Sequence, residues 1–430
     1  MTLTAWLAIA TFATAYVIIA SEKVNRAAVA LSGAAVMVLI GATRGEQIWF
    51  SADTGIDWNV VFLLFGMMVL VGILRQTGVF EFLAIWSAQR ARGRPFRTMV
   101  LLVLITAAAS ALLDNVTTVL LVAPVTLLLC DRMALPPIPF LLAEAMASNI
   151  GGTATLIGDP PNLIIASRAG LSFNDFLVNL APIVVVLMVV FIGLCWVLWG
   201  RRLRYDEKRA ASIMALTPRE TITDGPLLWR MLVILGLVLA AFVTHSLTHL
   251  EPSLAALLGA GAAVVISRQS HERYLAEVEW ETLLFFAGLF VMVGTLVHQG
   301  VIKDLAHALT TAIGGDYGLA AHGILIGSAG LSAIVDNIPY VATMSPIVHD
   351  LVGRGPGLPP EKASLWWALA LGADLGGNAT AIGASANVVI TGIAKRNGHP
   401  ISFWEFTRYG LVVAGVTIAW CVPYLALRYF

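Results

Sequence analysis

The chain has 430 residues, of which 58% are hydrophobic and only 12% are charged, whereas soluble globular proteins contain about 25% charged residues. This composition excludes a water-soluble single domain. The 26 Lys and Arg residues balance the 26 Asp and Glu residues, so no overall charge would attract nucleic acid. The three cysteines are far apart in the sequence, and their spacing indicates neither a disulfide framework nor a zinc site.

Apolar segments long enough to cross a bilayer recur along the whole chain. A hydrocarbon core of roughly 30 Å requires about 20 consecutive apolar residues in a helix. We expect such spans near 3–20, 26–42, 57–75, 138–168, 176–200, 229–248, 252–267, 280–298, 363–394 and 408–428. The sequence therefore predicts an all-α polytopic protein of the cell's inner (plasma) membrane, with about 10 transmembrane helices.

Two further apolar segments, 98–132 and 318–352, are each interrupted at mid-length by polar residues. Asp114–Thr117 interrupts the first segment and Asp336–Pro339 the second. Each segment is consistent with one crossing, two crossings or a re-entrant hairpin. If both return to their starting side, 20 of the 26 Lys and Arg residues fall on one face, as expected for the cytoplasmic face. The charges favour segments that return, but they do not fix how deep each one reaches.

The two halves of the chain share an ordered set of landmarks. At a spacing of 222 residues the matches are Trp58 with Trp280, Gly66 with Gly288, Asp114-Asn115 with Asp336-Asn337, and Pro124 with Pro346. Farther along, residues 151–162 match 376–387 at a spacing of 225. An odd number of crossings in each copy would invert the second relative to the first, as in many secondary transporters. We expect a first repeat over 1–200, a charged cytoplasmic linker over 201–228 and an inverted repeat over 229–430.

The matched segments 151–162 and 376–387 are rich in glycine, threonine and asparagine, and they interrupt spans that are otherwise helical. Unwound backbone at membrane depth is tolerated only where protein or a water-filled cavity satisfies it. We expect these two broken helices and the two hairpin tips to converge on one midplane cavity. The candidate substrate- and ion-binding residues are Asp114, Asn115, Thr117, Gly152, Thr153, Thr155, Asp159, Asn162, Asp336, Asn337, Asp374, Asn378, Thr380 and Asn387. The competing interpretation is structural, with glycines that pack helices closely and aspartates that cap helix ends.

Four of these candidates, Asp114, Asp159, Asp336 and Asp374, would make the cavity acidic. No Lys or Arg stands in either hairpin tip or either unwound segment, so only helix dipoles and co-bound cations would offset these charges. A neutral or cationic substrate therefore fits better than an anionic one. Carboxylates held close together away from water can exchange protons near neutral pH, which favours a proton-coupled antiporter. The chain has no Walker A pattern, and we expect neither ATP hydrolysis by this chain nor any other enzymatic activity.

The segment from Ser148 to Asn162, together with Asp114–Thr118 and Asp336–Pro339, resembles the ArsB and P-protein branch of the ion-transporter superfamily. The resemblance covers nearly the whole chain. It implies an elevator-type carrier with two re-entrant hairpins and two broken helices, related in fold to sodium-coupled dicarboxylate transporters. Within that branch, the stretch Gly158–Asn162 is closer to the P-protein subgroup. The hairpin tips carry aspartate where the dicarboxylate relatives carry the serine of a Ser-Asn-Thr motif.

The same resemblance implies export of arsenite or antimonite, as neutral hydroxides, in exchange for protons, and hence a role in arsenical resistance. It places Asp114 and Asn115 at the first tip and Asp336 and Asn337 at the second. The resemblance also implies that Asp374, Asn378 and Thr380 lie in the second broken helix.

Other functions remain open from the sequence. A sodium/proton antiporter or a sodium-coupled carboxylate transporter would use the same cavity, and a channel is less favoured. The coupling ion is expected to be H⁺ or Na⁺, with no other cofactor. The expected partners are a small inorganic substrate, membrane lipid, a cytosolic ATPase subunit and a second copy of the chain.

Overall fold

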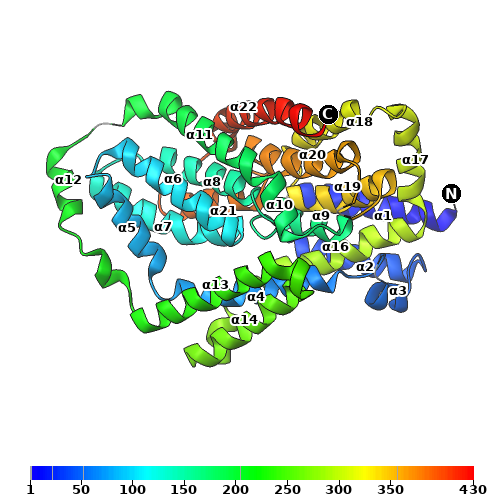
Figure 1. Ribbon diagram of the computed structural model, residues 1–430, viewed down its shortest axis with the longest axis horizontal. Coiled ribbons are helices and arrows are strands. Elements are labelled where there is room, and N and C mark those ends of the chain that lie inside the picture. The colour runs from blue at the N-terminus through cyan, green and yellow to red at the C-terminus, as the bar shows by residue number, and fades with distance from the viewer. Residues whose placement is uncertain (1, 22, 52, 204, 356) are drawn as a thin grey trace.

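The computed structural model describes residues 2–21, 23–51, 53–203, 205–355 and 357–430. All regular secondary structure in these residues is helical (Figure 1). Among them, eight helices are long and apolar enough to cross a membrane, and two shorter apolar helices accompany them. This confirms the prediction of an all-α polytopic membrane protein.

The helices of the first half alternate long apolar segments with short connecting ones. They are α1 (Leu3–Ala20), α2 (Arg26–Leu39), α3 (Gly45–Phe50), α4 (Trp58–Arg75), α5 (Val79–Arg90), α6 (Pro95–Leu112), α7 (Asn115–Met133), α8 (Pro137–Gly152), α9 (Pro160–Ala169), α10 (Phe173–Asn179) and α11 (Ala181–Leu198).

The second half repeats this order after a connecting segment that contains α12 (Glu207–Met214) and two short 3₁₀ turns, η1 (Gly200–Arg202) and η2 (Pro218–Thr221). Its helices are α13 (Gly225–Thr248), α14 (Pro252–Ser267), α15 (His271–Leu275), α16 (Trp280–His298), α17 (Val301–Ile313), α18 (Tyr317–Ser332), α19 (Asn337–Val352), α20 (Pro360–Gly376), η3 (Gly377–Ala379), α21 (Ser385–Arg396) and α22 (Phe403–Tyr429).

Each interrupted apolar segment forms a helical hairpin, α6–α7 in the first half and α18–α19 in the second. The turn is placed by an aspartate that caps the returning helix. Asp114 Oδ1 accepts a hydrogen bond from the backbone N–H of Thr117 at 2.7 Å, and Asp336 Oδ1 accepts one from Ile338 at 3.5 Å. Such caps satisfy backbone donors that a helix start leaves free. The two helical hairpins therefore follow directly from the polar interruptions, and how deep each one reaches into the membrane stays a prediction.

Two helices break where the sequence is rich in glycine. The first break separates α8 from α9, which starts with Pro160 and Pro161 as prolines commonly do at helix N-termini. A Cβ atom built on Gly152 would lie 2.5 Å from the carbonyl oxygen of Gly158. The two ends of this unwound stretch can approach so closely only because both residues are glycine. The second break, between α20 and α21, has the same form with Gly377 and Gly383.

Equivalent hydrogen bonds tie each break to the hairpin of its own half. Ser110 Oγ donates to the backbone oxygen of Ser148 at 2.7 Å, and Ser332 Oγ donates to that of Ala373 at 2.6 Å. Around them, α6 packs on α8 and α18 packs on α20. The repeat seen in the sequence is thus also a repeat of contacts.

Other helices form a separate layer. In Figure 1, α13, α4 and α14 run along one edge of the molecule, opposite α11 and α22. Close packing in this layer uses equivalent glycines, with Gly66 of α4 against Ala256 of α14 and Gly288 of α16 against Ala30 of α2. Helices α2 and α16 adjoin the second hairpin, because α16 also contacts α19.

The segment between the halves is fixed to the first half. Gln89 Nε2 at the end of α5 donates to the backbone oxygens of Ile213 at 3.1 Å and Leu216 at 2.6 Å. Arg204, which falls in the expected linker 201–228, lies outside the described residues, and the next transmembrane helix starts at Gly225. The domain boundaries stay a prediction.

Two equivalent short helices, α5 and α17, were not expected from the sequence. They have 12 and 13 residues, too few to cross a membrane. Each one leads into a hairpin, so in each half it connects the layer of long helices to the hairpin.

Candidate ion and substrate site

The hairpin tips contact the unwound stretches through asparagine side chains. At the second tip, Asn337 Nδ2 donates to both carboxylate oxygens of Asp159, at 3.3 and 3.2 Å. At the first tip, Asn115 Nδ2 donates to Asn149 Oδ1 at 3.1 Å. Asp159 belongs to the first half and Asn337 to the second, so the second tip completes a loop of the other half.

A second connection between the halves runs through Asn149. Its Nδ2 donates to Asn378 Oδ1 at 2.9 Å and to Asn387 Oδ1 at 3.1 Å. All three side chains are fully buried. The amides of one broken helix are therefore satisfied by those of the other, and both breaks meet in the interior of the protein.

Asp374 occupies the position of the second half that matches Asn149. It is fully buried (0% exposed), and neither of its carboxylate oxygens has a hydrogen-bond partner among the described residues. The side chains of Asn162 and Thr153 lie beside it, and Asn162 Oδ1 also has no donor there. Such uncompensated buried acceptors are costly in a folded protein and require a proton or a cation to satisfy them.

The four predicted carboxylates come together around Asp159. Asp159 is also 0% exposed and interacts electrostatically with Asp374, Asp336 and Asp114. Within the described residues no salt bridge reaches Asp159 or Asp374. Carboxylates at this depth are rare in membrane proteins and usually serve function.

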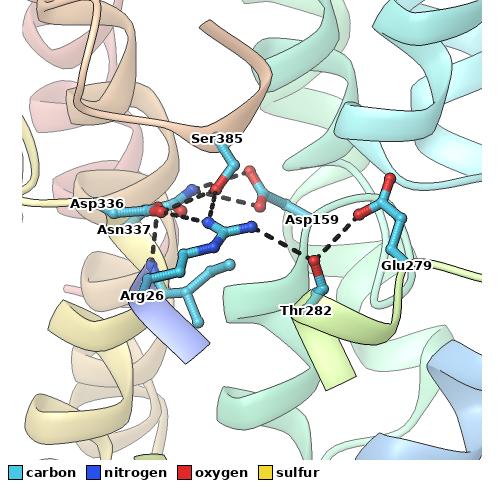
Figure 2. Close-up of polar contacts among 8 residues, drawn as sticks. Arg26, Asp159, Glu279, Thr282, Asp336, Asn337 and Ser385 are labelled. Atoms are coloured by element: carbon cyan, nitrogen blue, oxygen red, sulfur yellow. Dashed lines mark hydrogen bonds and ion pairs between the residues drawn. The ribbon is translucent and has the colours of Figure 1, made fainter. Parts of the chain in front are cut away.

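Asp336 differs from the other carboxylates because it has a cationic partner, shown in Figure 2. Arg26, the first residue of α2, donates from Nη1 to Asp336 Oδ2 at 3.1 Å and to Ser385 Oγ at 2.6 Å. Ser385 Oγ in turn donates to Asp336 Oδ2 at 2.8 Å. The expectation that only helix dipoles and co-bound cations offset the carboxylates is therefore wrong for Asp336.

A cavity of about 680 Å³ lies beside this cluster. Its charged lining residues are Lys23, Arg26, Glu279, Glu281 and Asp336. The lining thus carries both signs of charge, with acidic side chains in excess by one.

Several predicted site residues hold the backbone in place rather than face the cavity. Thr155 Oγ1 donates to Ala111 O, and Thr380 Oγ1 donates to Ala333 O, which ties each break to its hairpin. In the same way, the side-chain amides of Asn162 and Asn387 close their own unwound loops. Gly152 provides the close approach described above, and the backbone N–H of Thr117 is the group that Asp114 caps.

Four residues of the cluster were missed from the sequence: Arg26, Glu279, Thr282 and Ser385. Arg26 lies 310 residues from Asp336 along the chain. The concentration of Lys and Arg on the cytoplasmic face was already a sufficient explanation for a basic residue at this position. Asn149 was part of the recognised motif but not of the candidate list. Its match with Asp374 at a spacing of 225 was a signal that could have added it.

The chain matches the citrate transporter family over residues 16–372, which is most of its length. The chain belongs to this family. Among members of similar length, an uncharacterized transporter of Mycobacterium tuberculosis is 58% identical over 99% of this chain and 98% of its own. A 46 kDa membrane protein of Mycobacterium leprae is 55% identical over 98% of both chains.

Two more distant similarities concern a longer relative and a solved structure. The human P protein is 34% identical over 96% of the chain, which spans 59% of the P protein. The crystal structure of the Alcanivorax borkumensis YdaH transporter aligns with a TM-score of 0.59 at 15% identity, covering 91% of this chain and 87% of YdaH. The protein is a multi-pass membrane transporter of the citrate transporter family with a YdaH-like fold.

Proposed function

We propose that this transporter is a secondary carrier in which Asp159 and Asp374 exchange protons for a small solute. The observation that carries the proposal is the meeting of these two fully buried carboxylates at the junction of the two broken helices. Neither carboxylate has a salt-bridge partner among the described residues. Buried ionisable groups of this kind are typical of proton relays in transporters.

The surroundings of Asp374 support a proton as the coupling ion. A protonated carboxyl group has an O–H donor. The Asn162 side chain lies beside Asp374, and its Oδ1 has no donor in the described residues. Protonation of Asp374 would therefore place a donor next to a buried side chain that has an unsatisfied acceptor. A sodium ion could satisfy the same oxygens, so the choice of ion must be tested.

For the substrate we propose arsenite or antimonite, carried out of the cell as a neutral hydroxide. Amide and hydroxyl groups dominate the polar interior where the tips meet the breaks, and such groups suit a small neutral solute that both donates and accepts hydrogen bonds. We also propose that the carrier lies in the plasma membrane. It would work alone, beside a cytosolic ATPase subunit or with a second copy of the chain.

A second candidate is sodium-coupled transport of a carboxylate. It is favoured by the position of Arg26, whose guanidinium group lines the cavity beside Ser385. Arginine binds carboxylates well through paired hydrogen bonds. The description of the family as citrate transporters makes citrate the first carboxylate to test.

Flux measurements on the purified protein in liposomes test both candidates. Arsenite, antimonite and citrate are offered with a pH gradient, with a sodium gradient or with neither, and empty liposomes give the background. We expect flux of arsenite or antimonite that follows the pH gradient and is lost in Asp159→Asn and in Asp374→Asn. The matched control is Asp304→Asn, because Asp304 is exposed on α17.

The outcomes separate the candidates. Wild-type, pH-dependent flux in both Asp159→Asn and Asp374→Asn would refute proton coupling at these residues. Citrate uptake that follows sodium and ignores the pH gradient would select the second candidate.

A further inference from the structure

We propose that Arg26 is a positioning residue: through Asp336 it holds the second hairpin tip on Asp159 and keeps the cavity open on the side of α2 and α16. The inference concerns how the carrier changes conformation. It rests on the proposed function only for the role of Asp159.

Arg26 is held from several sides at once. Besides the hydrogen bonds to Asp336 and Ser385, its Nη2 donates to Thr282 Oγ1 of α16 at 3.3 Å. The guanidinium carbon lies 5.3 Å from the ring centre of Phe285, close enough for a cation–π contact. Thr282 Oγ1 donates to Glu279 Oε2 at 3.1 Å. The side chain is 24% exposed, so solvent screens this network only in part.

The network passes directly to the buried carboxylate. Asp336, which accepts the hydrogen bond from Arg26, is the N-cap of α19. The next residue, Asn337, donates to both oxygens of Asp159. Figure 2 shows Arg26 between Thr282 on one side and Asp336 and Ser385 on the other. A movement of the tip that breaks the pair with Arg26 would therefore also move the donors of Asp159.

The same contacts join two sets of helices across the cavity. Arg26 and Thr282 stand at the starts of α2 and α16, which pack on each other, whereas Asp336 and Ser385 stand at the starts of α19 and α21. Both sets line the cavity of about 680 Å³, and the lining residues Lys23 and Glu281 are exposed. The ion pair thus joins the two sets of helices at the wall of the cavity, and it resists movement of one set past the other while it is intact.

Among the described residues, the first hairpin tip has no such network. Arg26 starts α2, whereas Pro252 starts the corresponding helix α14. At the repeat spacings, Ser385 corresponds to Pro160 and Thr282 to Val60. Asp114, the equivalent of Asp336, instead lines a small apolar pocket with leucine and methionine side chains of α4. The first tip therefore shares the aspartate cap but lacks the arginine.

The test measures how fast a cysteine in the cavity reacts with a membrane-impermeant thiol reagent. The reporter is Val388→Cys on α21, because Val388 lines the cavity and is 39% exposed. The full-length protein is labelled in lipid nanodiscs, and the same chain without the reporter gives the background. That background is expected to be low, since Cys130, Cys195 and Cys421 are buried.

We expect Arg26→Gln and Asp336→Asn each to slow the labelling by about three-fold or more, since loss of the pair lets the tip leave the open state. Asparagine caps helices as well as aspartate, so Asp336→Asn changes the charge and keeps the cap. Arg26→Lys keeps one charged contact and should restore part of the rate. The double variant should be no slower than either single one, because both remove the same interaction.

Unchanged or faster labelling in both Arg26→Gln and Asp336→Asn, in protein that stays monodisperse, would overturn the inference. An equal change in Asp304→Asn would do the same, since Asp304 is exposed on α17 and belongs neither to this network nor to the carboxylate cluster. The labelling requires neither substrate nor a proton gradient. A failure of the proposed function, seen as normal flux in Asp159→Asn and Asp374→Asn, is therefore distinguishable from a failure of this inference.

Discussion

Asn149 and Asp374 occupy equivalent places in the two halves, 225 residues apart, yet they interact with their surroundings in opposite ways. Asn149 donates hydrogen bonds to two asparagine side chains of the second half. Asp374 lies beside the matching pair in the first half, Thr153 and Asn162, but no hydrogen bond of good geometry reaches its carboxylate among the described residues. One position is a satisfied structural link between the halves, and the other is a buried carboxylate whose neighbours do not satisfy it.

The hairpin tips differ in the same manner. Asp114 and Asp336 both cap the returning helix of their hairpin, but only Asp336 is paired with an arginine. The duplication therefore determines where polar side chains of the two halves meet. Single-residue differences between the halves determine which of these positions hold an ionisable side chain. The carboxylates with distinct surroundings therefore lie at positions where the two halves differ in sequence or in contacts.

The largest effect is expected for Asp374→Asn. The new amide can donate to Asn162 Oδ1, as Asn149 donates to its own partners, so the protein should become more stable while the exchangeable proton is lost. We expect flux to fall by roughly 100-fold or more and the melting temperature in detergent to rise. A variant that melts lower than the parent would show that positions 149 and 374 are not equivalent in structure.

The reverse change, Asn149→Asp, should destabilise the protein. The carboxylate cannot donate to Asn378 Oδ1 or Asn387 Oδ1, so two buried acceptors lose their donor. We expect a loss of about 2–4 kcal/mol, measured as a lower midpoint in thermal unfolding. Unchanged stability would mean that the amide link between the halves contributes little.

Alanine at the equivalent glycines tests the geometry of the breaks. A Cβ on Gly152 would meet the carbonyl oxygen of Gly158 at 2.5 Å, and one on Gly377 would meet that of Gly383 at 2.9 Å. We expect Gly152→Ala to cost about 1–3 kcal/mol and Gly377→Ala to cost less. Equal melting temperatures for the two variants would remove this difference between the halves.

The smallest effects are expected for Ser110→Ala and Ser332→Ala. Each removes the equivalent hydrogen bond from a hairpin to its broken helix. Ser110 Oγ also accepts a longer contact from Ser148 Oγ at 3.3 Å, but that hydroxyl has a shorter bond to Asn115 O at 2.9 Å, so losing the longer contact should cost little. Each loss should cost about 1 kcal/mol, to nearly the same extent in the two halves. A clear difference in unfolding midpoint between them would show that the two hairpins are not held alike.

Features set by nearby residues were predictable from the sequence. The expected segments 98–132 and 318–352 became the hairpins α6–α7 and α18–α19 with small shifts at their ends, because apolar length and an aspartate cap are local signals. The breaks at glycine-rich positions were predictable for the same reason. The short helices α5 and α17 were not, since their length suits neither a span nor a loop.

Contacts between the halves could not be predicted from local rules. Asn337 and Asp159 are 178 residues apart and Arg26 and Asp336 are 310 apart, so only the folded arrangement of the helices brings them together. The sequence indicated which residue types would gather in the interior. It did not indicate that one carboxylate would be paired with arginine while Asp374 would have no donor.

The amide link through Asn149 has a consequence for how the protein is assembled. Asn149 and Asn378 are 229 residues apart, and the interior of each half is completed by side chains of the other. A half synthesised on its own would leave these buried amides without their hydrogen-bond partners, so we expect each half to fold stably only together with the other.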